Sequence, residues 1–148
     1  VYEEKNEELS LGVIKSLSQK FIFLYVSHLQ ANEVRYLPAD RPLDQFKVFR
    51  KLKKGVKDYL VDGGESFFLL TNEKAKNFKI YSVPYKSVRS KAQWKLVQAH
   101  SKDVYIDEIE ALKGKLLVGE RIQGLDQVKV VDMKSLKSDY IKFEDKAY

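Results

Sequence analysis

Short apolar runs separated by polar residues dominate the chain. Lys20–Ser27 (KFIFLYVS) is almost continuously apolar, which is typical of a strand buried on both faces. Glu33–Leu37 (EVRYL) alternates polar and apolar residues, as a half-buried strand does, and a polar connection of hairpin length separates the two runs. Long segments with the 3.6-residue period of a helix are not apparent, although Asn72–Asn77 could hold one helical turn. The pattern predicts an all-β protein.

The same pair of strands recurs twice more along the chain. Ser66–Thr71 (SFFLLT) is followed by Asn77–Tyr81, and Lys115–Ile122 (KLLVGERI) is followed by Gln127–Val131. A short polar or glycine-containing turn lies between the members of each pair. The repeat predicts two sets of equivalent positions: Phe21, Phe67 and Leu116, and Val34, Phe78 and Val128.

Shorter strands flank each pair and complete the repeat. The preceding strands are predicted at Leu11–Ile14, Tyr59–Val61 and Ile106–Leu112. The following strands are predicted at Phe46–Phe49, Trp94–Val97 and Tyr140–Phe143. Each unit is therefore four antiparallel strands over about 45 to 50 residues, which is the period of a β-propeller blade. A β-sandwich is the rival architecture, but the threefold recurrence of one pattern favours consecutive blades.

The repeat divides the chain into successive blades at 9–52, 56–100 and 104–148. Residues 1–5 are predicted to end a preceding blade, with Val1–Glu4 as its outer strand, and the start at Val1 suggests a piece cut from a longer protein. Three blades cannot close a ring, because propellers use about four to eight. We expect the missing blades elsewhere, and homo-oligomers through the exposed blade faces when the piece is alone.

Composition narrows the classes of partner. Cysteine is absent, which excludes disulfides and thiolate metal sites. The net charge of +6 comes from 27 Lys and Arg against 21 Asp and Glu, but the basic residues are spread along the chain. We therefore expect a solvated surface and no nucleic-acid partner. No apolar run approaches the roughly 20 residues of a membrane-spanning helix, so no membrane partner is expected either.

Candidate catalytic residues are few. A nucleophilic serine usually lies in a Gly-x-Ser-x-Gly turn, and neither Ser10 nor Ser66 completes one. A triad also needs a histidine base, but His28 and His100 both fall in predicted connections and are interpreted as solvent-facing. Two isolated histidines without cysteine supply too few ligands for zinc. We predict no catalytic residue, no metal site and no cofactor, and leave the binding residues unassigned.

Acidic and polar residues on the first strand of each unit are the remaining candidates. Glu108 and Glu110 would share one face of a strand beside Asp107, and paired carboxylates can act in glycoside hydrolysis. A strand that lines a water-filled channel is the simpler interpretation. We expect Lys15, Asp58 and Glu108 to face a central passage. Gly63-Gly64 resembles a tight turn rather than a phosphate-binding loop, because no helix start with Lys and Ser or Thr follows it.

Several segments, in order, resemble the propeller of the prolyl oligopeptidase family and its oligopeptidase B branch. They are Glu33–Asp40, Phe46–Phe49, Leu70–Asn72, Ala75–Phe78, Trp94, Gly119–Leu125 and Phe143–Tyr148. The resemblance covers nearly the whole chain. It implies a seven-bladed propeller that covers an α/β-hydrolase domain carrying Ser, Asp and His, and that hydrolase domain has no counterpart in this chain.

The resemblance also implies a role. Relatives are cytoplasmic or periplasmic serine peptidases that cut short peptides, with a preference for Lys or Arg in the oligopeptidase B branch. This chain would be a non-catalytic propeller segment that admits peptides by size, with the missing blades and the hydrolase domain as its partners. By itself it should not hydrolyse peptides. The alternatives are a stand-alone module that binds a protein or peptide and, less favoured, a basic nucleic-acid-binding domain.

Overall fold

A computed structural model describes residues 9–142, in which the strands form three four-stranded antiparallel sheets, each in simple chain order. The first sheet contains β1 (Ser10–Lys15), β2 (Phe21–His28), β3 (Ala31–Pro38) and β4 (Lys47–Arg50). The second contains β5 (Asp58–Asp62), β6 (Ser66–Thr71), β7 (Lys79–Pro84) and β8 (Lys95–Gln98). The third contains β9 (Val104–Leu112), β10 (Lys115–Ile122), β11 (Leu125–Asp132) and β12 (Ser138–Tyr140).

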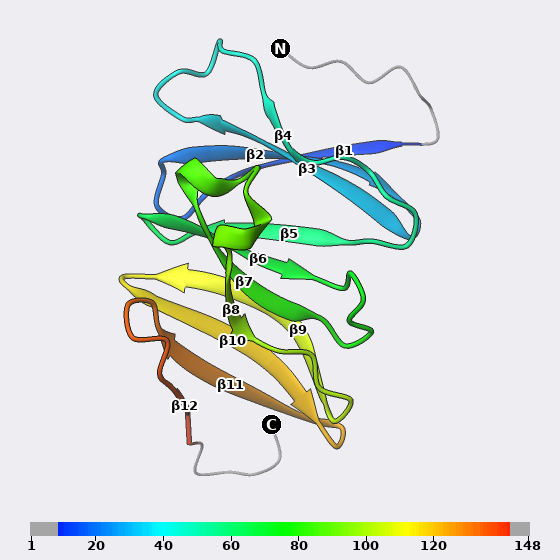
Figure 1. The fold of residues 1–148 in the computed structure, drawn as a ribbon, viewed down its shortest axis with the longest axis vertical. Coiled ribbons are helices and arrows are strands. Elements are labelled where there is room, and N and C mark those ends of the chain that lie inside the picture. Colours follow the sequence, from blue (N-terminus) through cyan, green and yellow to red (C-terminus); the bar gives the residue numbers. More distant parts are fainter. Residues whose placement is uncertain (1–8, 143–148) are drawn as a thin grey trace.

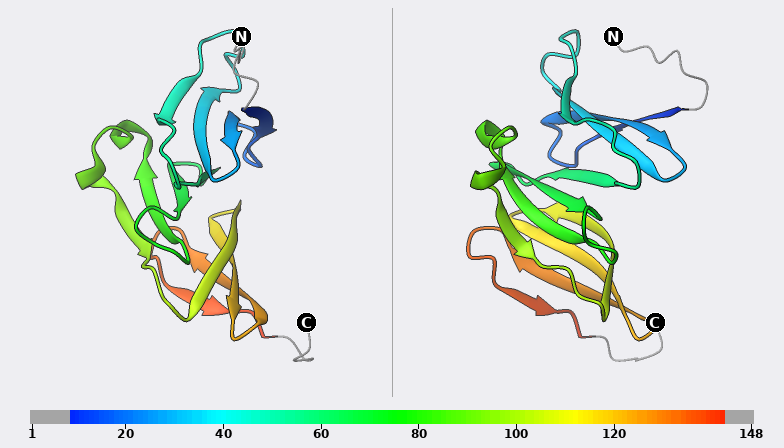
Figure 2. Two further views of the ribbon diagram at one scale, coloured as in Figure 1. Left: turned by 90° about the vertical axis from the view of Figure 1, so that its right-hand side faces the viewer. Right: turned by 45° about the vertical axis from the view of Figure 1, so that its right-hand side comes forward.

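The three sheets follow one another along the long axis of the molecule (Figure 1). Seen from the side, they lie along an arc, with the first strand of each sheet on its concave side and the last strand on its convex side (left panel of Figure 2). This radial succession of blades confirms the predicted propeller architecture and is unlike the two facing sheets of a sandwich. The strand predicted at Val1–Glu4 lies outside the described residues, as does Phe143.

The pairing register corrects two of the predicted equivalences. The β3–β4 ladder slips between Val34 and Arg35, and the β7–β8 ladder slips in the same way after Ile80. Ile80, rather than Phe78, therefore corresponds to Val34. Val34 pairs with Tyr25, and Ile80 pairs with Leu70. Counting three residues back from each of these partners makes Phe67 equivalent to Ile22 rather than to Phe21. The error arises because side chains alternate between the two faces of a sheet, so a slip of one residue in the alignment assigns each side chain to the wrong face.

The predicted second strand of the middle unit also begins too early. Phe78 has a left-handed φ of 73° and precedes β7, which starts at Lys79. The segment Asn72–Asn77 forms turns rather than the helical turn that the sequence allowed. The helical turns of the described chain are two short 3₁₀ helices, η1 (Tyr85–Ser87) and η2 (Lys91–Gln93), in the connection between β7 and β8.

The central position of β6 explains its continuous apolar sequence. Phe67 and Leu69 point toward the first sheet, whereas Phe68 and Leu70 point toward the third sheet, and all four are nearly inaccessible to solvent. A strand with a sheet on each side cannot alternate apolar with polar residues. The middle blade thus supplies one face to each of two separate cores.

The first blade interface, between the β1–β4 and β5–β8 sheets, is built mainly from aromatic rings. Phe67 lies at its centre, with ring centroids 4.9 Å from Phe21 and Tyr85 and 5.2 Å from Tyr36. Phe49 stacks on Trp94 at the convex side, with centroids 5.7 Å apart. Edge-to-face and offset geometries of this kind are favourable beyond the area they bury.

The second blade interface, between the β5–β8 and β9–β12 sheets, is mainly aliphatic. Its buried residues alternate along facing strands and come from both sheets: Phe68, Leu70, Phe78, Ile80, Ile106, Ile109, Leu116, Val118 and Val131. Phe78 makes the edge-to-face ring contact of this core, with Tyr105 at 5.9 Å. The same sheet geometry therefore accommodates two different core compositions.

Side chains of the first blade cap the free edge of the next inner strand. The β5 amides of Asp58 and Leu60 donate to Asn32 Oδ1 (2.6 Å) and to the Tyr25 hydroxyl (3.1 Å). The Tyr25 hydroxyl also donates to the Leu60 carbonyl (3.4 Å), and burial raises the pKa of Tyr25 to about 12. These bonds satisfy backbone groups that an unpaired strand edge would leave open.

A charged cluster lies at the edge of the first blade interface. Arg50 of β4 donates two hydrogen bonds to the carboxylate of Asp58 (2.7 and 2.9 Å) and one to Glu73 (3.0 Å). Asp58 is only 3% exposed. Lys53 and Lys91 also pair with Glu73, and its hydrogen bond with Lys91 and the nearby Arg50 lower the pKa of Glu73 to about 2. One arginine thus joins two carboxylates of the following blade.

The second blade interface contains a buried carboxylate of its own. Glu120 of β10 is 1% exposed and accepts hydrogen bonds from Gln98 Nε2 (2.5 Å) and the Tyr140 hydroxyl (2.7 Å). The Lys129 ammonium lies 3.1 Å from Glu120 Oε2 and also donates to Gln98 Oε1. Burial and the bond to Glu120 raise the pKa of Tyr140 to about 12. Here one charge pair and two neutral donors satisfy a single carboxylate.

Candidate functional site

Three strand connections, one from each blade, meet at one end of the molecule. The β1–β2, β5–β6 and β9–β10 turns all lie at the left of Figure 1, at the ends of the inner strands. The β9–β10 turn is two residues long, and Lys113 and Gly114 both have positive φ (45° and 80°). That geometry is typical of a type I′ hairpin, in which glycine is preferred at the second position. Gly64 provides the left-handed residue (φ 95°) of the β5–β6 turn.

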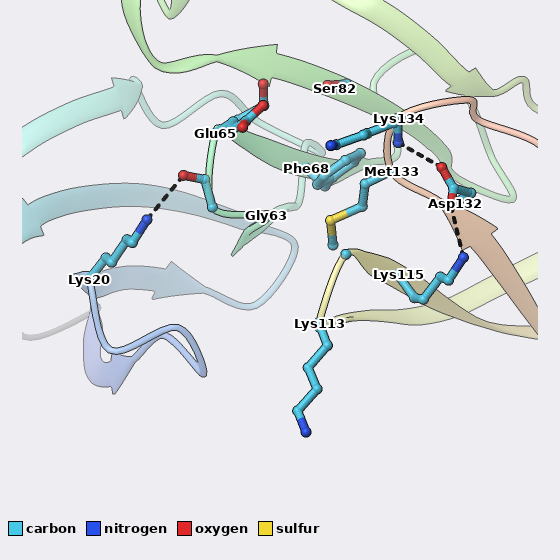
Figure 3. Close-up of a pocket in the computed structure, with 13 residues that line it drawn as sticks. Lys20, Gly63, Glu65, Phe68, Ser82, Lys113, Lys115, Asp132, Met133 and Lys134 are labelled. Carbon is cyan, nitrogen blue, oxygen red and sulfur yellow. Dashed lines mark hydrogen bonds and ion pairs between the residues drawn. The ribbon is translucent and has the colours of Figure 1, made fainter.

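These connections surround a hollow of about 560 Å³, which we call the turn hollow. Its lining comes from the β1–β2 and β5–β6 turns, Ser82 and the β9–β10 and β11–β12 turns: Lys20, Gly63, Gly64, Glu65, Ser66, Phe68, Ser82, Lys113, Gly114, Lys115, Asp132, Met133 and Lys134. Figure 3 shows Phe68 and Met133 side by side at its centre. A β-carbon on Gly63 would lie only 2.4 Å from the Phe68 ring, so the absence of a side chain there permits the ring position.

Cations dominate the turn hollow. Lys20 donates to the Gly64 carbonyl (3.2 Å), and Lys115 pairs with Asp132 (2.8 Å). Asp132 also accepts the backbone amides of Lys134 (3.0 Å) and Ser135 (2.9 Å). The Lys115 ammonium, followed by those amides, lowers the pKa of Asp132 below its ordinary range. Asp132 is therefore fully occupied by groups that belong to its own turn.

Lys134 extends across Phe68 toward Glu65, whereas Lys113 points away from the centre of the hollow (Figure 3). Among residues 9–142, the Lys134 ammonium has no hydrogen-bond or ion-pair partner. With Asp132 neutralised by Lys115, the remaining charges that line the hollow are Lys20, Lys113 and Lys134 against Glu65. The hollow thus combines an apolar floor with an excess of positive charge.

A second, smaller hollow of about 270 Å³ lies among the inner strands. Lys15, Glu108 and Glu110 line it together with apolar residues of β1, β5 and β9. Lys15 and Glu108 are solvent-exposed, but exposure alone does not place them on a central passage, so that expectation stays a prediction. Asp58 does not face a passage, and that expectation is wrong: its side chain points into the first blade interface, where Arg50 holds it.

Side-chain direction in a strand explains this difference. Side chains project from the faces of a sheet, and in a propeller those faces look toward the neighbouring blades rather than along the radius. Asp58 lies on the face that the first blade covers. Glu108 pairs with Gly119 and lies on the outer face of the third sheet, next to Glu110 at the alternate position. The two carboxylates share a face, as predicted, while Asp107 sits at a bulge within 3.8 Å of Arg121.

A partly buried network of polar side chains fixes the β1–β2 turn to the second blade. The Ser16 and Ser18 hydroxyls are 2.8 Å apart, and Ser18 donates to Asp62 Oδ2 (2.5 Å). The Tyr85 hydroxyl donates to the other oxygen of Asp62. Burial, followed by the bond to Asp62, raises the pKa of Tyr85. This hydrogen-bond network has a structural role, because all of its side chains hold the two connections together.

The residues considered for catalysis are not brought together. His28 ends β2 at the opposite end of the sheets from the turn hollow, and both it and His100 are exposed. The Ser10 hydroxyl donates to the Ser27 carbonyl (3.4 Å), and Ser66 borders the turn hollow, which no histidine lines. Within 9–142, no three His, Asp or Glu side chains are grouped as metal ligands. Over the same range, no helix has the length and apolar character needed to cross a membrane.

Comparison with known proteins assigns the chain to a family. Residues 1–148 match the family described as "Prolyl oligopeptidase, N-terminal beta-propeller domain". The chain belongs to this family. The match confirms the resemblance drawn from the sequence and agrees with the three stacked blades.

Relatives within the prolyl oligopeptidase family are much longer than this chain. It is 33% identical over 150 residues to a dipeptidyl aminopeptidase BI of Pseudoxanthomonas mexicana, a match that covers the whole chain and 20% of that protein. It is 30% identical over 131 residues to a protease 2 of Moraxella lacunata, covering 88% of the chain and 19% of the relative. The chain therefore spans about a fifth of the length of these relatives.

Solved structures of the family share the fold. Oligopeptidase B from Trypanosoma brucei, with covalently bound antipain in a closed form, superposes with a TM-score of 0.87 at 19% identity. Oligopeptidase B from Leishmania major superposes with a TM-score of 0.86 at 22% identity. Each match covers 97% of this chain and 21% of the solved chain. At this level of identity the likeness concerns the fold.

Sequence reasoning missed the buried charges that join the blades. Glu120 occupies an inward position of β10, in line with Leu116 and Val118, so a carboxylate in an otherwise apolar alternation was a readable signal. Glu73 and Arg50 fall in or beside connections, where charged residues are ordinary. The turn hollow was also missed, because its lining comes from four separate turns that only the stacked propeller brings together.

Proposed function

We propose that this chain is a non-catalytic wall segment of a serine oligopeptidase that hydrolyses short peptides after Lys or Arg. The observation that carries the proposal is the arc of stacked blades whose whole length matches the prolyl oligopeptidase propeller family. The role follows from the physical properties of such an arc. It supplies a rigid boundary that selects substrates by size, while bond cleavage belongs to the hydrolase domain of the longer polypeptide.

Rigidity of the wall supports selection by size. Each blade completes its own backbone pairing, and each junction is closed by a packed core and a satisfied charged group. No buried side-chain polar atom lacks a partner among the described residues. Separating two blades would expose a core and leave Asp58 without Arg50 or Glu120 without Gln98, so opening between these blades is costly.

The test compares the longer polypeptide that carries this chain with the chain by itself. The longer polypeptide should hydrolyse short arginyl and lysyl peptides, and cleavage should fall steeply as the same sequence is placed in longer peptides and then in a folded protein. The chain by itself should show no turnover. Equal cleavage of short peptides and folded proteins, or no peptidase activity in the longer polypeptide, would contradict the proposal.

The end faces of the arc support a related expectation about partners. On the first blade, Val13 is 65% exposed and Leu11 is 46% exposed, although both lie in a strand. We propose that blades of the same longer polypeptide cover these faces, and that the chain by itself associates with further copies through them. Light scattering over a range of concentrations tests the second part, and a monomer at high concentration would contradict it.

A further inference from the structure

The cations of the turn hollow are satisfied to different degrees. Lys115 is neutralised by Asp132, and Lys20 is bonded only to a neutral backbone carbonyl (Gly64, 3.2 Å). The Lys134 ammonium, which has no partner among residues 9–142, lies beside the apolar floor of the hollow (Figure 3). A cation held next to an apolar surface inside a concave site attracts an anion more strongly than one on an open surface.

We propose that the turn hollow binds an organic carboxylate attached to an apolar group, such as the C-terminal residue of a short peptide. The carboxylate would bind Lys134 and Lys20, and the apolar group would pack mainly on Met133, beside the accessible edge of Phe68.

The size and chemistry of the hollow fit such a ligand. A volume of about 560 Å³ lies within the range of small-molecule sites and accommodates a residue or two of peptide. Phe68 is held rigidly, because it is 2% exposed and packs in the second blade interface. Met133 is partly exposed and adaptable, which suits a floor that receives apolar groups of different shape.

Glu65 and Ser82 refine the expected ligand. The Glu65 carboxylate borders the side of the hollow toward which Lys134 extends (Figure 3), so a second negative charge on the ligand would be repelled there. Ser82 also lines the hollow and offers a hydroxyl that can donate or accept. The combination favours a singly charged carboxylate over a phosphate or a dicarboxylate.

Met133 provides a direct reporter of binding, since it lines the turn hollow and is the one methionine among the 148 residues of this chain. We would label methionine methyl groups with ¹³C in the full-length polypeptide that carries this chain, and assign the Met133 signal by its loss in Met133→Leu. The probes are N-acetyl-Ala-Phe with a free carboxylate, its C-terminal amide, and N-acetyl-Phe-Glu amide, whose carboxylate is on a side chain.

The expected result is a saturable shift of the Met133 methyl signal with the free acid and none with its amide. Binding of the free acid alone identifies a peptide C-terminus as the ligand, whereas equal binding of the Glu probe means that any carboxylate beside an apolar group is accepted. Loss of peptidase activity would not affect the test, because the readout is a methyl resonance.

Lysine variants provide the matched comparison. Lys134→Gln and Lys20→Gln should each weaken binding of the free acid about fivefold, the size of effect expected for a partly exposed charge contact. Lys113→Gln removes the same charge from a side chain directed away from the hollow and should leave the affinity unchanged. No shift with either carboxylate probe, equal binding of the amide, or an equal loss in Lys113→Gln would overturn the proposal.

Discussion

The two blade interfaces join sheets of the same topology with different chemistry. The first is filled by aromatic rings around Phe67 and bordered by Arg50, which serves two carboxylates. The second is filled by aliphatic side chains and contains Glu120, which is almost inaccessible and bonded mainly to side chains of its own blade and to Gln98. Each sheet completes its pairing internally. An interface therefore has only to fill volume and satisfy its polar groups, and more than one set of residues does so.

The difference lies in how strongly each junction depends on single residues. A few large rings and one arginine concentrate the contacts of the first interface on few positions. The second interface distributes its burial over many branched side chains of similar size. We therefore expect single substitutions in the first interface to be more damaging than matched ones in the second.

Truncation of the central ring should have the largest effect. Phe67→Ala removes a ring that is 1% exposed and contacts rings from three strands and the β7–β8 connection, so we expect a loss of about 3–5 kcal/mol in the free energy of unfolding. Leu116→Ala, at 0% exposure in the second interface, should cost less, about 2–4 kcal/mol. Urea unfolding of both variants in the same polypeptide measures the difference.

Hydrogen exchange would show where each loss is felt. Phe67→Ala should accelerate exchange in β2 and β5 while β10 and β11 stay protected, and Leu116→Ala should show the opposite pattern. Equal costs with uniform loss of protection would mean that the interfaces are one cooperative unit and that the contrast between them has no energetic meaning.

The fold was more accessible from the sequence than these interface details. Continuous apolar runs such as Phe67–Leu70 signal a strand covered on both faces, and their recurrence is enough to predict blades. The failure at Phe78 has a local cause, since a left-handed residue just before β7 moves the strand two places on. Tertiary pairing, which no periodicity encodes, decides that Asp58 faces Arg50 rather than a passage.

Removal of the shared arginine should be the second most damaging change. Arg50→Met leaves Asp58 buried and unpaired and also releases Glu73, so we expect a loss of about 3 kcal/mol in the free energy of unfolding. The matched change in the second interface, Lys129→Met, leaves Glu120 with its bonds from Gln98 and Tyr140 and should cost about 1–2 kcal/mol.

A double variant separates a lost charge pair from lost packing. Arg50→Met combined with Asp58→Asn should be less destabilised than the sum of the two single changes, because the second removes the charge that the first leaves unpaired. Additive losses, or a larger cost for Lys129→Met than for Arg50→Met, would show that the first interface does not depend more strongly on its charged cluster than the second.

A single hydroxyl tests the capping of the inner strand edge. Tyr25→Phe keeps the ring but leaves the Leu60 amide of β5 without its acceptor, so we expect a loss of about 1–2 kcal/mol. Tyr59→Phe is the control, because this neighbouring ring, 6.1 Å from Tyr25, is 39% exposed, and its loss should stay within about 0.5 kcal/mol. Equal effects in the two variants would mean that the Tyr25 hydroxyl does not stabilise the first interface.

The smallest effect should be a change in the acid dependence of stability. Lys91 and Arg50 hold the folded-state pKa of Glu73 at about 2, below its ordinary value of 4.5. A depressed pKa contributes stability that is fully present above pH 4.5 and is lost as the pH falls toward 2. Glu73→Gln should therefore cost about 1 kcal/mol or less at neutral pH and flatten the loss of stability in that interval.

The control for this change is Glu110→Gln, which removes an exposed carboxylate of the inner strand that takes no part in the Arg50 cluster. Unfolding free energies measured between pH 2 and pH 7 should show the same acid limb in Glu110→Gln as in the unchanged chain and a shallower one in Glu73→Gln. If the loss of stability at low pH were the same in Glu73→Gln as in the unchanged chain, protonation of other groups would be responsible for it. The charged cluster of the first interface would then position the two blades without making their stability depend on pH.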